Sequence, residues 1–249
     1  MIRDLHRRRG RERRGLALLE GVRLVEEAIA TGVALRGAVT SAALEGTPRG
    51  RALKALLRER TSRLEEVEEE ALTTLATTEH PQGVVAVIEP PVWTLDQIRL
   101  GPSATLLMLD GVQDPGNVGA MVRTAAGLGA QGVIALPGTA EFTNPKALRG
   151  TMGAFFRLPC VAAAAPVVRD WLGENRVAVW VAETGGEPLR GRDGAGPLAL
   201  VLGNEGAGPG PELTAAAARR VAIPLAAGVE SLNVAVAAGI LLWEVTRGG

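Results

Sequence analysis

A short polar segment, residues 110–119, carries the first side chains that could do chemistry. It reads Asp-Gly-Val-Gln-Asp-Pro-Gly-Asn-Val-Gly, and Arg123 follows it among small residues. Asn117 is well placed to cap a helix or to present its amide outward. A guanidinium group is a planar fork that can bind two phosphate oxygens. Taken alone, this first polar segment favours an ordinary capping turn followed by a surface arginine.

Two further polar segments follow apolar runs. The second polar segment, residues 202–210, reads Leu-Gly-Asn-Glu-Gly-Ala-Gly-Pro-Gly, and the third, residues 230–235, reads Glu-Ser-Leu-Asn-Val-Ala and comes shortly after Ile223-Pro224-Leu225. Glycine lets a backbone approach a ligand closely, but Glu205 would repel a phosphate and the spacing of a P-loop is absent. Taken singly, the second segment is interpreted as a tight turn and the third as an ordinary helix N-cap.

The elements that must position these segments alternate between apolar runs and helical stretches. Strands are expected at Leu106–Leu109, Val133–Leu136, Val177–Val181, Leu198–Leu202 and Val221–Ile223, and helices near 117–128, 167–173, 211–219 and 231–246. This alternation predicts an α/β fold with a parallel sheet and helices on both faces. Ligands bind such sheets at the carboxyl ends of the strands, so chemistry is expected in the segments that follow the strands.

The first ninety residues follow a different pattern. Apolar spacing predicts a helix over 14–31, and then come an apolar run at 35–39, a helix near 50–60, an acidic helix start at 65–70 and a strand at 84–88. Pro90-Pro91 and Gly101-Pro102 bracket a linker. We therefore expect an N-terminal domain at 1–92, a linker at 93–103 and a second domain at 104–249.

Composition excludes several classes of protein. The 249 residues are 47% hydrophobic and 22% charged, which is typical of a globular chain. One cysteine excludes an internal disulfide, and two histidines leave little from which to build a zinc site. No stretch approaches the roughly 20 apolar residues that span a bilayer. A soluble, cytoplasmic protein without a metal is expected.

Charge is distributed unevenly along the chain. Net charge is zero, with 27 basic and 27 acidic residues, but the first 14 residues hold seven arginines against Asp4 and Glu12. Because guanidinium suits phosphate, the arm at residues 3–14 is a candidate RNA contact. A merely solvated arm fits the charge pattern equally well.

Together, the three polar segments resemble the SpoU (TrmH-like) family of RNA ribose 2′-O-methyltransferases. The resemblance rests on the order Asp-Pro-Gly-Asn-x-Gly-x-x-x-Arg, Leu-Gly-Asn-Glu-Gly-x-Gly, and Ile-Pro-Leu with Glu-Ser-Leu-Asn-Val, and it covers about residues 103–247. Residues 146–156 also resemble the family between the first two motifs. Residues 18–41 and 78–84 are similar to its small N-terminal substrate-binding domain, which has an L30e-like fold.

The resemblance implies a knotted, SPOUT-type α/β fold, S-adenosyl-L-methionine as cofactor, no metal, and a homodimer whose subunits complete each other's sites. The catalytic residues that it implies are Arg123, Asn117, Glu205, Ser231 and Asn233. The cofactor-binding residues that it implies are Gly203, Ile223 and Leu232, with Leu202, Asn204, Gly206 and Leu225 as neighbours. Ala235 stands where the family commonly has a serine, so one hydroxyl near the cofactor is missing.

The implied reaction moves a methyl group from a sulfonium to a ribose 2′-hydroxyl, which requires aligned reactants and removal of a weakly acidic proton. An arginine at the position of Arg123 has been discussed in the family as the general base, but guanidinium stays protonated in proteins. We therefore expect Arg123 to hold a phosphate beside the target ribose, so that this phosphate or a water takes the proton. Glu205 is expected to pair with Arg123.

Three other functions compete with this one. A nucleotide-dependent oxidoreductase needs a glycine fingerprint after the first strand and an acidic residue about 20 positions later, and neither is found. A non-catalytic RNA-binding protein of the same fold would lose the polar motif residues, which are all present. A tRNA 2′-O-methyltransferase is the third, but a separate N-terminal domain resembles the ribosomal-RNA members more, so 23S rRNA is the expected substrate.

Overall fold

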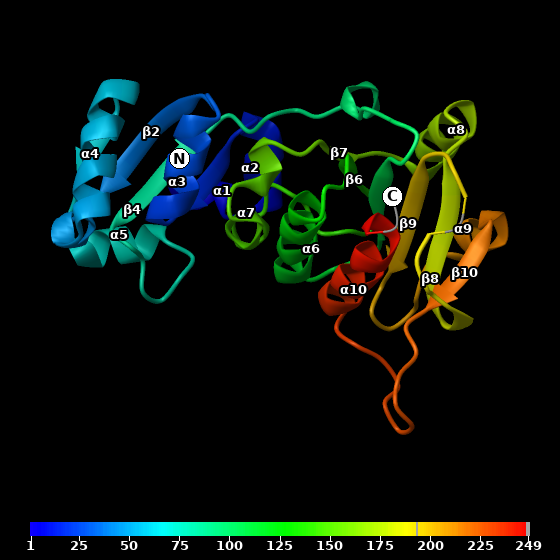
Figure 1. Cartoon of the computed structure of the whole chain (residues 1–249). Coiled ribbons are helices and arrows are strands. Elements are labelled where there is room, and N and C mark those ends of the chain that lie inside the picture. Colours follow the sequence, from blue (N-terminus) through cyan, green and yellow to red (C-terminus); the bar gives the residue numbers. More distant parts are fainter. Residues whose placement is uncertain (193, 248–249) are drawn as a thin grey trace. The chain divides into compact units, whose positions relative to one another are not determined.

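The chain, described here by a computed structural model for residues 1–192 and 194–247, divides into two compact units (Figure 1). The first unit comprises Met1–Val92 and Phe142–Arg157, and the second Trp93–Glu141 and Leu158–Gly249. Residues 142–157 therefore belong to the first unit, although the sequence predicts a second domain at 104–249 that includes them.

The first unit is built on a four-stranded sheet in the order β1-β4-β2-β3. Strand β4 is antiparallel to β1 and β2, whereas β2 and β3 are parallel. The strands are β1 (Ala17–Glu20), β2 (Leu35–Thr40), β3 (Leu64–Glu66) and β4 (Val84–Ile88). The helices are α1 (Ile2–Leu5), α2 (Arg8–Arg14), α3 (Val22–Ala30), η1 (Ala42–Gly46), α4 (Pro48–Arg60), α5 (Glu69–Leu75), α7 (Pro145–Thr151) and η3 (Ala154–Phe156).

Two expectations for this unit are wrong. The helix expected over 14–31 is instead a strand, β1, followed by α3, with a break at Gly21, whose φ is +100°. Every residue of β1 is buried, and a short apolar run of this kind fits a buried strand as well as a helix. The acidic helix start at 65–70 begins as a strand, β3, and only then becomes α5.

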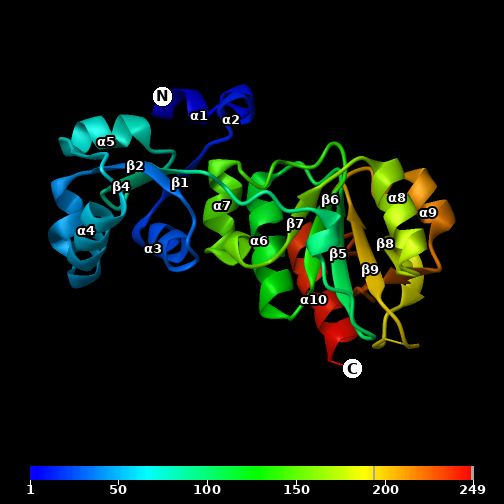
Figure 2. The same ribbon diagram turned by 90° about the horizontal axis from the view of Figure 1, so that it is seen from above.

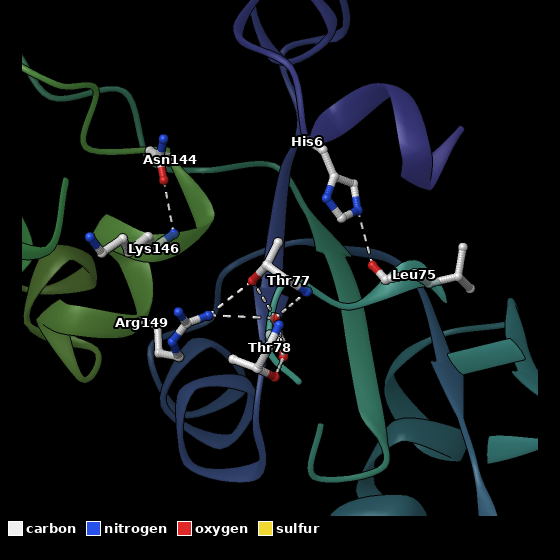
Figure 3. Close-up of polar contacts among 8 residues, drawn as sticks. His6, Leu75, Thr77, Thr78, Asn144, Lys146 and Arg149 are labelled. Atoms are coloured by element: carbon white, nitrogen blue, oxygen red, sulfur yellow. Dashed lines mark hydrogen bonds and ion pairs between the residues drawn. The ribbon is translucent and has the colours of Figure 1, made fainter. Parts of the chain in front are cut away.

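A buried carboxylate ties three parts of this unit together. Glu20, at the end of β1, accepts hydrogen bonds from the backbone N–H of Thr77 at 2.9 Å and of Thr78 at 3.2 Å, and from both threonine hydroxyls. Nη1 of Arg149, on α7, lies 3.5 Å from Glu20 and donates to Thr77 Oγ1 at 2.9 Å (Figure 3). We call these four residues the Glu20 cluster, and their contacts help attach residues 142–157 to the first unit.

The second unit is built on a six-stranded sheet in the order β10-β8-β9-β5-β6-β7, in which every neighbouring pair is parallel. Its strands are β5 (Thr105–Asp110), β6 (Gly132–Ala135), β7 (Cys160–Ala162), β8 (Ala178–Pro188), β9 (Leu198–Gly203) and β10 (Arg219–Ala222). The predicted α/β class and all five expected strands are confirmed. Strand β7, with three residues, was not predicted.

Helices cover both faces of this sheet, as expected. Helices α6 (Pro115–Gly127) and α10 (Val234–Thr246) lie on one face, and α8 (Ala165–Glu174) and α9 (Pro211–Ala216) on the other; Figure 2 shows the two layers from above. Alternate strand residues such as Met108 and Val201 pack on Val168 and Leu172 of α8. The short helix η2 (Leu95–Gln97) precedes the sheet. No helix in the described part of the chain combines the length and apolar character of a bilayer-spanning segment.

The strand order brings the polar segments to one edge of the sheet. Strand β5 pairs directly with β9, and Asp110 at the end of one is in register with Gly203 at the end of the other. Strand β8 lies between β9 and β10. The segments after β5, β9 and β10 therefore leave the sheet at neighbouring carboxyl ends, where an open α/β sheet binds its ligands.

Candidate active site

The first polar segment is a fixed turn that starts α6. Asp114, rather than Asn117, caps the helix, because its Oδ1 accepts the backbone N–H of Asn117 at 2.9 Å. Thr139 Oγ1 accepts the N–H of Gly111 at 3.0 Å and donates to the carbonyl of Leu109 at 2.9 Å. The side chain of Asn117 is therefore free to act outside its own helix.

Three predicted catalytic side chains, one from each polar segment, meet at this edge. Asn117 Nδ2 donates to Glu205 Oε1 at 2.8 Å, and Asn233 Nδ2 donates to Asn117 Oδ1 at 3.1 Å. Asn233 also caps α10, since its Oδ1 accepts the N–H of Ala235 at 3.0 Å and of Val236 at 3.3 Å. We call Asn117, Glu205 and Asn233 the Asn117 cluster. Both ends of the Asn117 amide are engaged, so its orientation is fixed.

The second polar segment is shaped by Asn204. Its Oδ1 accepts the N–H of Gly206 at 2.9 Å and of Ala207 at 3.0 Å, and its Nδ2 donates to the carbonyl of Gly111 at 3.0 Å. This amide folds the second segment on itself and ties it to the first. Asn204 therefore has a structural task in addition to the cofactor contact that the resemblance implies.

Gly203, which is already assigned to the cofactor, and Asp110, which sequence reasoning did not single out, complete this turn. A Cβ on Gly203 would lie 2.1 Å from the carbonyl carbon of Gly208, so only glycine lets the segment return across the strand end. Asp110 Oδ2 accepts the N–H of Gly210 at 2.7 Å. Asp110 stands at the carboxyl end of a predicted strand, which is the signal that would have identified it.

A pocket of about 660 Å³ opens beside the Asn117 cluster, between the ends of β8, β9 and β10 and the third polar segment. This volume is typical of a small-molecule site. The residues that line it include all seven assigned to the cofactor, Leu202, Gly203, Asn204, Gly206, Ile223, Leu225 and Leu232, and two assigned to catalysis, Glu205 and Ser231.

The chemistry of the pocket wall suits a ligand with a positive charge and a flat apolar group. Glu183, Glu205 and Glu230 line it, whereas no lysine or arginine stands among the described lining residues. Glu183 is partly neutralised by Arg220, whose Nη1 lies 3.4 Å away. Leucine, isoleucine and glycine form much of the remaining wall. Glu183 follows the predicted strand 177–181, so the strand-end rule would also have located it.

Arg123 stands apart from this pocket. It is exposed on α6, does not line the pocket, and has no hydrogen-bond or ion-pair partner among residues 1–192 and 194–247. The expected pair with Glu205 is not formed within the chain, because Glu205 binds Asn117 instead. Six helical residues at about 100° each place Arg123 roughly 120° around α6 from Asn117. Ser231 is exposed, and its hydroxyl has no partner in the same described residues.

Known proteins are similar to this chain over nearly its whole length. The family model described as "SpoU rRNA Methylase family" matches residues 104–243, and that of the "MRM3-like substrate binding domain" matches residues 1–86. The 23S rRNA (guanosine(2553)-2′-O)-methyltransferase RlmP of Bacillus subtilis is 32% identical over 243 residues, which cover 97% of this chain and 92% of RlmP.

Two solved structures with bound AdoMet are also similar. An rRNA methyltransferase from Sinorhizobium meliloti has a TM-score of 0.88 and 31% identity, and the match covers 99% of this chain and 93% of that one. The SpoU methyltransferase AviRb from Streptomyces viridochromogenes has a TM-score of 0.87 and 31% identity, with coverages of 99% and 95%.

Proposed function

The chain belongs to the SpoU rRNA Methylase family, and from this premise we propose that it transfers a methyl group from S-adenosyl-L-methionine to a ribose 2′-hydroxyl of 23S rRNA. One observation carries the proposal: three polar side chains from three separate segments meet beside a pocket lined by every residue assigned to the cofactor. The named 23S rRNA enzyme RlmP and its match over both parts of the chain favour ribosomal RNA over tRNA.

The pocket fits S-adenosyl-L-methionine in size and in chemistry. Leu202, Ile223, Leu225 and Leu232 would hold its apolar purine face, while the backbone around Gly203 offers polar groups without side-chain bulk. The carboxylates of the pocket wall attract the net positive charge of the cofactor. When bound, the cofactor supplies an electrophilic methyl group on a sulfonium.

On the RNA side, the Asn117 cluster orients the target ribose. Glu205 uses Oε1 for Asn117, so Oε2 and the Ser231 hydroxyl are the groups left to contact ribose hydroxyls. Holding the nucleophile in line with the methyl group is the main task of such a site. Arg123 keeps its proton and holds an adjacent phosphate, and the 2′-hydroxyl proton passes to that phosphate or to a water.

We propose a homodimer because Arg123 must reach a site that it does not reach in its own chain. Val236, Ile240 and Trp243 of α10 are 52%, 39% and 50% exposed and form one stripe along the helix. Helix α10 packs on α6 beside Arg123, and a Cβ on Gly239 would lie 3.6 Å from Thr124 Cγ2. Pairing of two such stripes would bring Arg123 of each copy toward the other copy's pocket.

Mixing two inactive variants tests this shared site. Arg123→Ala and Glu205→Ala, refolded together, should recover activity that neither has alone, because one site of the mixed dimer is intact. Trp243→Glu should yield monomers in sedimentation and lose activity. Full activity of a monomeric Trp243→Glu protein would contradict the proposed dimer.

We also propose that residues 1–92 select the RNA and that 93–103 link them to the methyl-transfer domain at 104–249, of which residues 142–157 pack with the first unit. We propose further that the protein works in the cytoplasm. The match of residues 1–86 to a substrate binding domain supports the first point. The bacterial 23S rRNA enzymes that the chain resembles support the last.

Methyl transfer from labelled S-adenosyl-L-methionine to unmodified 23S rRNA and to tRNA, followed by nucleoside mass analysis, tests the reaction. A 2′-O-methylated nucleoside from 23S rRNA, absent with Arg123→Ala, would establish both reaction and substrate class. A product on tRNA alone would replace the substrate. A protein that binds RNA but no cofactor would be a non-catalytic member of the fold.

A further inference from the structure

The arginine-rich arm predicted at residues 3–14 is folded as α1 and α2, and the fold uses several of its arginines. Arg11 is buried and donates from Nη1 to the carbonyls of residues 5 and 6 at 3.1 and 3.0 Å. Arg13 and Arg14 both bind Asp4 Oδ2 at 2.7 Å. Arg8 binds Glu12 at 2.8 Å. These four guanidinium groups are engaged within the chain.

Arg3 differs from them because it is exposed and has no polar partner among the described residues. It lies at a groove of about 470 Å³ in the first unit, together with Arg36 and Arg63. The guanidinium of Arg63, at the start of β3, is also without a partner in this part of the chain, whereas Arg36 pairs with Glu89. Three guanidinium groups thus surround one groove.

The floor of this groove is apolar because α1 covers only part of the sheet. Ile2 and Leu5 pack with Val85 and Val87 over the β1–β4 half of one face. Over the other half, the groove is lined by Val39, Val67 and Leu75. Gly37 on β2 adds no side chain to this floor, and a Cβ there would lie 3.1 Å from the carbonyl oxygen of Arg63.

We propose that this groove binds an unpaired nucleotide of the RNA substrate, at a distance along the RNA from the methylated ribose. The proposal rests on the proposed function, because it takes RNA as the partner. Phosphates bind the free forks of Arg3 and Arg63, and the base lies on the apolar floor. Bases that are splayed out of a loop are what most proteins read in RNA.

One acidic residue at the groove gives it a preference among bases. Glu65, exposed on β3, also lines the groove. A carboxylate repels phosphate but accepts a hydrogen bond from an exocyclic amino group. The groove therefore favours cytosine, adenine or guanine over uracil, which has no such group.

Binding to a 23S rRNA transcript, measured without cofactor at several salt concentrations, tests the groove. Arg3→Gln combined with Arg63→Gln should weaken binding roughly tenfold near 0.15 M salt and lower the log–log salt slope by about 1.4, since two phosphate contacts are lost. The matched control is Arg49→Gln with Arg157→Gln. It removes two charges from exposed arginines of the same unit that are already paired, with Glu26 and Glu27. It should leave affinity and slope close to wild type.

Equal losses in the groove variant and the control would overturn the proposal, because charge in general would then be responsible. An unchanged groove variant with an intact melting curve would overturn it as well. Cross-linking with 6-thioguanosine-substituted RNA, whose base keeps an exocyclic amino group, should label peptides that contain residues 1–3 or 63–67, and labelling only of the second unit would contradict the site. If the wild-type protein binds no RNA, the proposed function fails, and this inference fails with it. If the groove variant transfers methyl groups at the wild-type rate and binds RNA normally, the groove proposal fails while the proposed function stands.

Discussion

Each unit contains a glutamate that is held by polar neighbours. The two glutamates differ in whether a carboxylate oxygen remains available for a ligand. Glu20 is only 6% exposed and accepts four hydrogen bonds, with Arg149 at its side. Glu205 is exposed and binds one side chain, Asn117, leaving its second oxygen open. The same residue type therefore serves the fold in the first unit and keeps an oxygen available at the candidate active site in the second.

The difference follows from the cost of burying charge. A carboxylate removed from water is tolerated only when its acceptor capacity is filled, so the surroundings of Glu20 use all of it for the protein. An exposed carboxylate has no such cost, and it can keep an oxygen for a ligand. The comparison predicts that changes in the Glu20 cluster affect stability and that changes around the Asn117 cluster affect catalysis.

The largest effect is expected from Arg123→Ala. Loss of the phosphate contact should lower kcat/KM for methyl transfer by about 10²- to 10³-fold. The free energy of unfolding should change by less than about 0.5 kcal/mol, because the side chain is exposed and unpaired. Steady-state kinetics and denaturant unfolding measure the two quantities.

Two variants sharpen this result. Arg123→Lys keeps the charge but not the planar fork, so it should remain strongly impaired, and near-full activity would show that the fork is unnecessary. Arg169→Ala, an exposed arginine on α8 paired with Asp170, should leave activity unchanged.

The next effect in size is expected from Glu20→Ala. Removal of the carboxylate leaves the Thr77 and Thr78 donors without their acceptor and Arg149 without its counter-charge, so unfolding should be easier by about 3 kcal/mol. Binding of S-adenosyl-L-methionine to the second unit, measured by calorimetry, should be unaffected. A stable Glu20→Ala protein with weakened cofactor binding would reverse the comparison.

The sequence predicted the second unit better than the first, for a physical reason. Buried parallel strands such as Leu198–Leu202 are continuous apolar runs, and the strand-end rule then places the chemistry. In the first unit, Leu18 and Val22 have helical spacing, yet a strand ends between them at Glu20, because pairing with β4 decides the structure. Local pattern does not contain that partner. The expected knot likewise rests on the resemblance alone, since periodicity carries no signal for chain crossing.

The sequence and the resemblance predict members for the candidate site, but they do not predict the contacts among them. Spacing and resemblance brought Asn117, Glu205 and Asn233 forward, but their hydrogen bonds join residues 88 and 116 positions apart. The expected Arg123–Glu205 pair failed because helix geometry turns Arg123 away from Asn117. The attachment of residues 142–157 to the first unit depends on Arg149 meeting Glu20, which no local pattern reveals.

Two residues of the first polar segment, Asn117 and Asp114, are expected to give contrasting effects of intermediate size, one on catalysis and the other on stability. Asn117→Ala breaks the Asn117 cluster and should lower kcat roughly 10- to 100-fold through misalignment, with little change in stability. Asp114→Ala removes the cap of α6 and should cost about 1 kcal/mol of stability. Kinetics and unfolding of both variants decide the matter. A stability loss from Asn117→Ala as large as that from Asp114→Ala would place Asn117 with the structural residues.

The smallest effect is expected at Lys54, a buried ammonium whose Nζ lies 2.8 Å from Glu45 and 2.9 Å from Glu66. The hydrogen bonds that Lys54 donates to Glu45 and Glu66 raise the pKa of Lys54, and the bond to Glu45 lowers the pKa of Glu45. The stabilisation from Glu45 is present above its ordinary pKa of 4.5 and is lost as pH falls through the lowered value.

Lys54→Met should therefore flatten the fall of the denaturation midpoint below about pH 5, because Glu45 then has no lowered pKa to lose. On the alkaline side, the contribution of Lys54 disappears only as pH rises through its raised pKa, above 10.5. Both glutamates are about half exposed, and water weakens such pairs, so the effect should be smaller than that of Glu20→Ala. Parallel acid limbs for wild type and variant would mean that Glu45 is not held by Lys54. Burial of Lys54 alone would then not be enough to give Glu45 a structural role. The contrast between Glu20 and Glu205 would then depend on whether the carboxylate itself is buried.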